Sequence, residues 1–315
     1  MMEFFRIKHD IPFMRYGKLT TAISMITFLF AIWALAYKHL NLGVDFTGGT
    51  VIEVAYQQDA HIDNIRAILA TTGYTEASVQ TFGTAKDVLI RLPLHENSTS
   101  AKTSDIVMNA LKAQDATVTL KRVDFVGPQV GKELYDNGAL ALLVVAGGIL
   151  LYLAIRFEWR FALAAILANI HDVVIILGCF AFFQWEFTLT VLAGVLAVLG
   201  YSVNESVVVF DRIRENLRKM RKSSIPDIID NAITTTMSRT IITHGMTQIM
   251  VLSMLFFGGE ALHNFALALT IGIMFGIYSS VLVASPLLLM FGVKREHFIK
   301  DTTPKEGVTT DGAQV

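Results

Sequence analysis

Six long runs of apolar residues dominate the chain, and segments rich in charged and polar residues separate them. A helix needs about 20 mostly apolar residues to cross the hydrocarbon core of a bilayer, which is about 30 Å thick. Each run approaches or exceeds that length, so the pattern predicts a polytopic α-helical membrane protein. The expected spans cover residues 19–37, 138–155, 161–183, 187–210, 240–257 and 265–291.

The first apolar run has features of a cleavable signal peptide. Basic residues precede it, and Ala-Leu-Ala at 34–36 resembles a cleavage site. However, the run is longer than the roughly 7 to 15 apolar residues of a signal-peptide core, and it contains Trp33. We therefore expect an uncleaved membrane anchor.

Residues 38–137, between the first and second spans, are more polar and have a different periodicity. Alternation of apolar and polar residues predicts strands, and apolar residues every three or four positions predict helices. The resulting order, β-α-β-β-α-β, is that of a ferredoxin-like α+β domain. The expected elements are a strand at 50–56, a helix at 62–71, strands at 77–82 and 87–92, a helix at 104–113 and a strand at 117–124.

Composition agrees with this organisation and narrows the functional classes. Of 315 residues, 53% are hydrophobic and 17% charged, and the mean hydropathy is +0.52. The core of a single water-soluble domain does not need so many apolar residues. The formal net charge is −1, so the broad basic field of a nucleic-acid-binding protein is absent, and we expect no nucleic-acid partner. Nor does the sequence predict a catalytic centre, a metal site or a cofactor.

The distribution of Lys and Arg predicts the orientation. The leading segment, 1–18, and the tail, 292–315, are basic, whereas the short loops at 184–186 and 258–264 contain no Lys or Arg. Positive residues near the ends of spans stay in the cytoplasm. We therefore expect cytoplasmic termini, a disordered tail, and a periplasmic domain at 38–137 if the membrane is a bacterial inner membrane.

The longest basic loop lies between the fourth and fifth spans. Residues 212–236 contain a run of basic residues followed by apolar residues at helical spacing, with Ser224 and Pro226 as start signals. The pattern predicts a short amphipathic helix lying at the cytoplasmic interface of the membrane lipid.

Polar residues occur inside three of the expected spans. An ionisable side chain costs at least about 2.5 to 3.5 kcal/mol at the bilayer centre, so each requires an explanation. His171 and Asp172 lie near the middle of the third span, Asn204 and Glu205 lie in the fourth, and Arg239 opens the fifth. Glu205 and Arg239 are expected at similar depth, where an ion pair between neighbouring helices is geometrically reasonable.

Two interpretations of these residues remain open. In the structural one, Arg239 extends to the headgroups, Glu205 pairs with it statically, and His171 and Asp172 satisfy each other. In the functional one, the same groups form a proton relay, because burial and neighbouring charges shift the protonation of a carboxylate. A hydrolase is disfavoured, since the further metal ligands or paired aspartates that it would need are missing.

Two glycine-bearing segments flank the inserted domain. Neither has the GxxxxGK[ST] spacing of a phosphate-binding loop, and the first leads into a strand, so both are interpreted as turns. They are residues 43–50, with Asp45, Gly48 and Gly49, and residues 126–133, with Gly127 and Pro128.

Several of these motifs together resemble the SecD/SecF branch of the resistance-nodulation-division transporters. The resemblance rests on GVDFTGGT at 43–50, Val-Gly-Pro at 126–128, His171-Asp172, Ser-Arg-Thr at 238–240, and GYSVNESVVVFDRIREN at 200–216, which includes Asp211 and Arg212. It implies six of the twelve spans of such a transporter. By motif match, Glu205 takes the place of an intramembrane acid and Arg239 that of its basic partner. Asn204 sits where SecD carries its own Asp.

The resemblance also implies a function and partners. The expected role is to work with SecD, and commonly YajC, beside the SecYEG channel and its SecA motor, using the proton-motive force to move a translocating preprotein. Two alternatives stay open. One is a homodimeric, proton-driven exporter of hydrophobic compounds, and the other is a subunit that only supports assembly.

Overall fold

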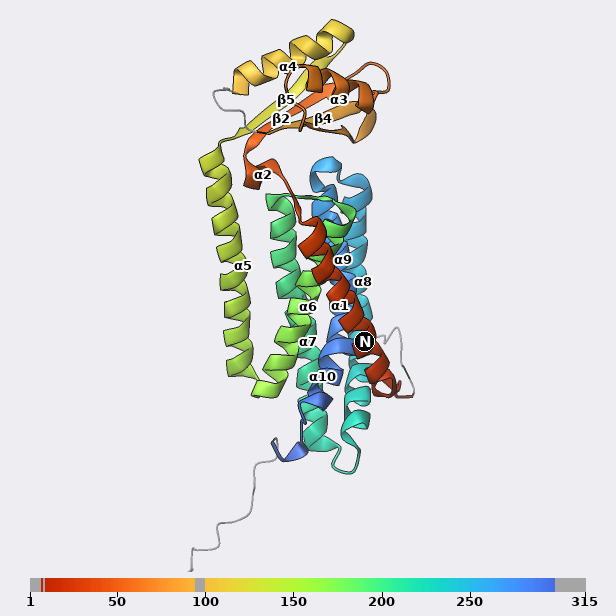
Figure 1. The fold of residues 1–315 in the computed structure, drawn as a ribbon. Coiled ribbons are helices and arrows are strands. Elements are labelled where there is room, and N and C mark those ends of the chain that lie inside the picture. The colour runs from red at the N-terminus through yellow and green to blue at the C-terminus, as the bar shows by residue number, and fades with distance from the viewer. Residues whose placement is uncertain (1–6, 8, 94–99, 298–315) are drawn as a thin grey trace, which may run out of the picture.

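The computed structural model describes residues 7, 9–93 and 100–297. It is an elongated molecule in which a bundle of long helices carries a small α/β domain at one end (Figure 1). Most of the tail predicted to be disordered, and most of the leading segment before residue 9, lies outside the described residues.

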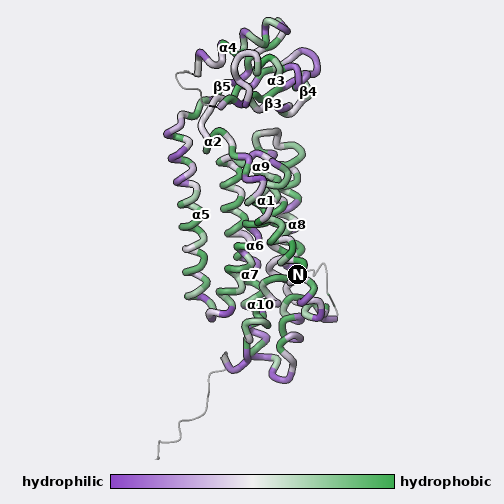
Figure 2. The backbone as a smooth tube through the Cα atoms, viewed as in Figure 1, coloured by the Kyte–Doolittle hydropathy of each residue, from purple (hydrophilic) through white to green (hydrophobic). Residues whose placement is uncertain are grey.

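The described residues contain six helices that are long and apolar enough to cross a membrane, which confirms the predicted number of spans. Figure 2 shows the apolar stretches running along these helices, with polar residues at both ends of the bundle. The helices are α1 (Gly17–Lys38), α5 (Pro128–Arg156), α6 (Trp159–Phe183), α7 (Leu189–Lys219), α8 (Ile225–Phe257) and α9 (Glu260–Ser279), the last continuing through a π-helical turn (Ser280–Ala284) into α10 (Ser285–Met290).

The inserted domain, defined here as residues 49–126, has the predicted βαββαβ order. Its antiparallel sheet has the strand order β3-β4-β2-β5, and α3 and α4 lie on the face away from the bundle (Figure 1). The core between the sheet and these helices contains Ile52, Leu69 and Ile90, all fully buried. The elements are β2 (Gly49–Ala55), α3 (Ile62–Thr71), β3 (Ser78–Phe82), β4 (Thr84–Leu92), α4 (Ser100–Gln114) and β5 (Thr119–Val126).

Short elements between α1 and the domain contact the bundle directly. Strand β1 (Asn41–Leu42) pairs in parallel with β6 (Glu186–Phe187), which lies between α6 and α7. The single-turn helix α2 (Val44–Thr47) follows and packs against α5. The domain is therefore held close to the end of the bundle at which α7 begins.

The predicted interfacial helix within 212–236 is wrong. Helix α7 continues to Lys219, and α8 begins at Ile225 and runs without a break into the fifth span. Ile228, Ile229 and Ile233 are buried in the bundle core rather than facing lipid headgroups. Ser224 and Pro226 do mark a helix start, since Ser224 is the N-cap of α8 and Pro226 lies in its first turn. Periodicity shows that one helix face is apolar but does not show what covers that face.

Close packing of α1 on α6 gives a first testable prediction. A Cβ atom added at Gly178 would lie 2.4 Å from Ala31 Cβ and 2.7 Å from its Cα. We expect Gly178→Ala to force the helices apart and to lower the free energy of unfolding by about 1–3 kcal/mol. Gly147→Ala on α5 is the matched control, since no atom lies within 4 Å of the added Cβ. Thermal unfolding in detergent measures both, and equal melting temperatures would contradict the prediction.

Candidate functional site

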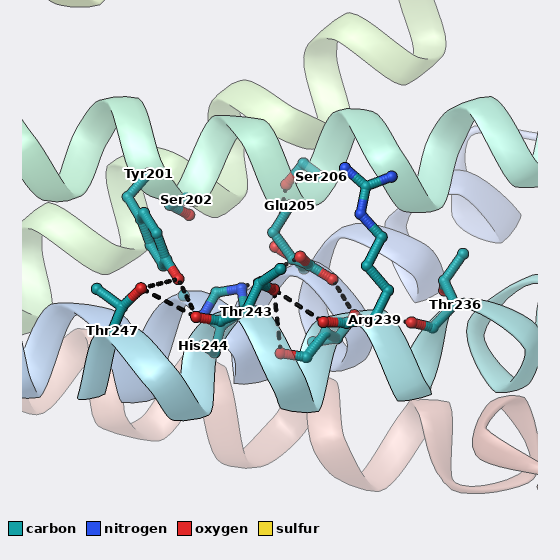
Figure 3. Close-up of polar contacts among 12 residues, drawn as sticks. Tyr201, Ser202, Glu205, Ser206, Thr236, Arg239, Thr243, His244 and Thr247 are labelled. Carbon is teal, nitrogen blue, oxygen red and sulfur yellow. Dashed lines mark hydrogen bonds and ion pairs between the residues drawn. The ribbon is translucent and has the colours of Figure 1, made fainter. Parts of the chain in front are cut away.

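Glu205 lies near the middle of α7 and is 5% exposed. Its carboxylate accepts a hydrogen bond from Thr240 Oγ1 at 2.5 Å and lies 3.1 Å from His244 Nε2 (Figure 3). Thr240 and His244 are four residues apart on α8, so they share the helix face that meets α7. An ionisable carboxylate and an ionisable imidazole are therefore in direct contact between two spanning helices.

The surroundings of His244 fix its ring in place. The ring of Tyr201 packs edge-on against it, with centroids 4.7 Å apart. The Tyr201 hydroxyl lies 3.1 Å from Thr247 Oγ1 and donates to the backbone of α8 at Thr243. Among the described residues, His244 Nδ1 is buried with no hydrogen-bond partner.

The predicted ion pair between Glu205 and Arg239 is wrong. Arg239 is exposed, and within the described part of the chain it has no ion pair. Figure 3 shows its guanidinium beside the α7 ribbon, with no dashed line to the carboxylate. Arg239 and Thr240 leave α8 about 100° apart, and Thr240, not Arg239, contacts the Glu205 carboxylate. Similar depth in two helices does not by itself produce an ion pair, because the rotation of each helix about its axis decides which side chains meet.

A second carboxylate is buried deeper in the bundle. Asp172 on α6 is 1% exposed and accepts hydrogen bonds from Ser202 Oγ at 2.6 Å and Ser279 Oγ at 2.7 Å. His171 Nδ1 lies 3.3 Å away, and the His171 ring stacks on Phe28 of α1. Helices α6, α7 and α9 thus converge on one carboxylate.

The two carboxylates contact neighbouring faces of α7, about 60° apart around the helix. Ser202, which donates to Asp172, and Glu205 are three residues apart on that helix. One turn after Ser202, Ser206 Oγ lies 3.1 Å from the Oγ of Ser280, which is the first residue of the π-helical turn. Single π-helical turns in α-helices occur frequently at functional sites. Helix α7 therefore presents polar groups both to α8 and to α6 and α9.

Asn204 does not join either cluster. It is exposed on α7, although it directly precedes Glu205. The sequence pattern also left Thr240 and His244 without a role, although both follow Arg239 in the same span. Their four-residue spacing was the signal that could have identified them, because it places two polar groups on one face of an apolar helix.

The predicted motif residues at the start of the inserted domain lie at the end of the bundle. Asp45 Oδ2 accepts a hydrogen bond from the backbone of Leu189, the first residue of α7, at 2.9 Å. Gly48 and Gly49 have φ angles of 72° and 143°, a region that favours glycine. Gly127 is the N-cap of α5 and Pro128 its first residue, a position that suits proline.

The remaining motif residues lie at the opposite end of α7. Asp211 forms an ion pair with Arg156 of α5 at 2.7 Å. Arg212 forms one with Glu215 at 2.7 Å and donates to Thr235 of α8. These half-exposed contacts join α7 to its neighbours and do not contact the buried carboxylates.

Six spanning helices with carboxylates buried between them, and a ferredoxin-like domain after the first helix, define a polytopic membrane protein built as one half of a resistance-nodulation-division type transporter. The family described as "Protein export membrane protein SecD/SecF, C-terminal" matches residues 106–294, and the "SecD/SecF GG Motif" matches residues 33–60. The chain therefore belongs to the SecD/SecF family.

Individual relatives agree with this assignment. The protein translocase subunit SecF of Vibrio alginolyticus is 44% identical over 99% of this chain and 99% of its own length. That of Escherichia coli O157:H7 is 40% identical over 94% of this chain and 92% of its own length. The crystal structure of SecDF from Thermus, a translocon-associated membrane protein, superposes with a TM-score of 0.81 at 33% identity. It matches 92% of this chain, which spans only 39% of the SecDF chain.

Proposed function

We propose that the chain is an accessory subunit of the Sec protein translocase, which acts with SecD and uses the proton-motive force to promote preprotein translocation. The observation that carries the proton-driven part is the contact of Glu205 with Thr240 and His244 between α7 and α8. As a carboxylate, Glu205 accepts hydrogen bonds from both side chains. Proton uptake turns one carboxylate oxygen into a donor, so the contact between the two helices must change.

The membrane potential is large enough to drive such a change. Moving one charge through 100 mV is worth about 2.3 kcal/mol, which is comparable to a charged hydrogen bond of about 1.5–3 kcal/mol. Asp172, which is hydrogen-bonded by Ser202 of α7, provides a second group that takes up protons. In this proposal, the two carboxylates and their contacts with α7 convert proton passage into movement of that helix.

The exposed polar residues of α7 and α8 support a second six-span partner. Asn204 and Arg239 are exposed in the structure although they lie in membrane-spanning helices. A charged residue at that depth is costly unless protein or water covers it. We propose that SecD packs over this surface and completes the twelve spans, and that YajC, SecYEG and SecA belong to the same assembly. The location is a bacterial inner membrane, with both termini cytoplasmic and the inserted domain periplasmic.

Purification tests this assembly against the homodimeric exporter. We expect the tagged chain, extracted from its native membrane in mild detergent, to co-purify with an unlike six-span SecD protein in equal amounts. Mass spectrometry of the intact complex gives the stoichiometry. A complex that contains two copies of this chain and no SecD would contradict the proposal and favour the exporter. The same chain overexpressed without SecD is the control, because it shows whether self-association occurs when the partner is scarce.

A further inference from the structure

Two connecting segments of the chain link the inserted domain to the bundle. The chain enters the domain at Gly48 and Gly49, and it leaves through Gly127 into α5. The two segments are in close contact. A Cβ added at Gly131, in the first turns of α5, would lie 2.8 Å from the backbone nitrogen of Gly48 and 3.2 Å from Phe46 O, both in the entering segment. Because both attachments meet at one point, the domain can turn about that point without breaking its sheet or unwinding α5.

Beside this pivot, a cleft of about 300 Å³ lies beneath the sheet face that no helix covers. Arg91 of β4 and Glu186 of β6 form an ion pair in it, and each side chain is only 12% exposed. The carboxylate of Glu186 also fills the space beside Gly43, where a Cβ would lie 2.9 Å from its Oε1. Among the ion pairs of the described residues, this is the one that links a residue of the inserted domain to a residue of the bundle.

The pair is costly to bury. Burial raises the pKa of Glu186, assisted by Asp45, even though Arg91 opposes the rise. Burial likewise lowers the pKa of Arg91 against the attraction of Glu186. Both directions mean that lost hydration outweighs the attraction between the partners, as is common for buried ion pairs. The other charged groups that line the cleft are Glu53, Arg122 and Asp124.

The bundle side of the pair is continuous with the helix that carries Glu205. Glu186 lies three residues before Leu189, where α7 begins and where Asp45 caps it. From Leu189 to Glu205 the helix has no break, a distance of about 24 Å at 1.5 Å per residue. A shift or tilt of α7 therefore moves Glu186 relative to Arg91.

We propose that Arg91 and Glu186 are positioning residues that form a releasable latch, which opens when α7 moves and frees the inserted domain to swing about the glycine pivot. The low net gain of the buried pair suits a contact that must open and close repeatedly. The existence of the latch rests on the geometry above, and only its driving force rests on the proposed function.

Distance measurements between spin labels test the latch in the full-length chain in lipid nanodiscs. With Cys179→Ser as background, labels at Asn64→Cys on α3 and Leu262→Cys on α9 report the position of the domain over the bundle. We expect a narrow distance distribution that broadens towards longer distances in Arg91→Gln and in Glu186→Gln, because each leaves one charge buried without its partner. The apolar pair Arg91→Met/Glu186→Leu should stay narrow.

Arg122→Gln is the matched control. Arg122 lines the same cleft, but its partner is Asp124 on its own strand, so its loss should leave the distribution unchanged. Distributions for Arg91→Gln and Glu186→Gln that superpose on the unmutated protein would overturn the proposal, as would equal broadening in Arg122→Gln or in the apolar pair. These outcomes do not depend on export, so a latch can be established even if the proton-driven function fails.

Discussion

Replacing Glu205 by Gln is expected to reduce preprotein export to the level seen without a proton-motive force. Gln keeps the size of the side chain and can still hydrogen-bond Thr240, but it cannot take up or release a proton. The lost hydrogen-bond strength is about 1 kcal/mol, which is too little to unfold the bundle. Export into inverted membrane vesicles, measured with and without an uncoupler, separates the proton-dependent part from the part driven by ATP.

Three matched variants make this prediction sharper. Glu205→Asp keeps the carboxylate but shortens the arm, so we expect partial proton-dependent export. His244→Gln removes the titratable partner and should also weaken it. Arg239→Met changes an exposed residue that does not touch the carboxylate, so within this chain it should leave the contact of Glu205 with α8 intact. A defect in Arg239→Met would therefore indicate a role for its charge that does not depend on the hydrogen bonds of Glu205 to α8.

Full proton-dependent export in Glu205→Gln would contradict the role given to this carboxylate. The static alternative has its own signature, because a purely structural Glu205 should be replaceable together with His244 by any well-packed neutral pair. Membrane insertion and recovery of the complex are measured alongside, so that loss of assembly is not mistaken for loss of coupling.

Much of the fold could be predicted from the sequence because its physical causes are local. A run of about 20 apolar residues has few alternatives to crossing a membrane. The strand and helix periodicities of the inserted domain gave the right element order, and Ile62–Thr71 matches the predicted helix residue for residue. The error at Ile228 and Ile229 arose because an apolar stripe packs equally well against lipid or against another helix.

The site was predictable only in part, because contacts between helices depend on rotation and not on depth alone. Composition pointed to Asp172 and Glu205, since short carboxylates are rare in spans. It could not show that Ser279, far along the chain, donates to Asp172, or that His244 replaces Arg239 as the neighbour of Glu205. Likewise, the pairing of Arg91 with Glu186 depends on how the domain sits on the bundle, which no local pattern encodes.

Asp172→Asn is the second substitution with a large expected effect on export. The amide has nearly the same shape, and the hydroxyls of Ser202 and Ser279 can rotate to bond it, so we expect the bundle to fold. Asp172→Leu is different, because it leaves the buried Ser202 hydroxyl and His171 without this acceptor, at about 1–3 kcal/mol for each unsatisfied group, whereas Ser279 Oγ can still donate to Gly276 O. Its yield and melting temperature should fall sharply, whereas those of Asp172→Asn should stay near the unmutated values.

If Asp172 takes up protons, Asp172→Asn loses proton-dependent export despite normal assembly, and its defect does not add to that of Glu205→Gln. Non-additivity is expected because both carboxylates act on α7, so that breaking either step stops the same movement. A folded Asp172→Asn variant with normal proton-dependent export would instead assign Asp172 a purely structural role, in which its three hydrogen-bond donors hold α6, α7 and α9 together. Proton coupling would then depend on Glu205 within this chain, and any second proton-binding group would have to come from the partner subunit.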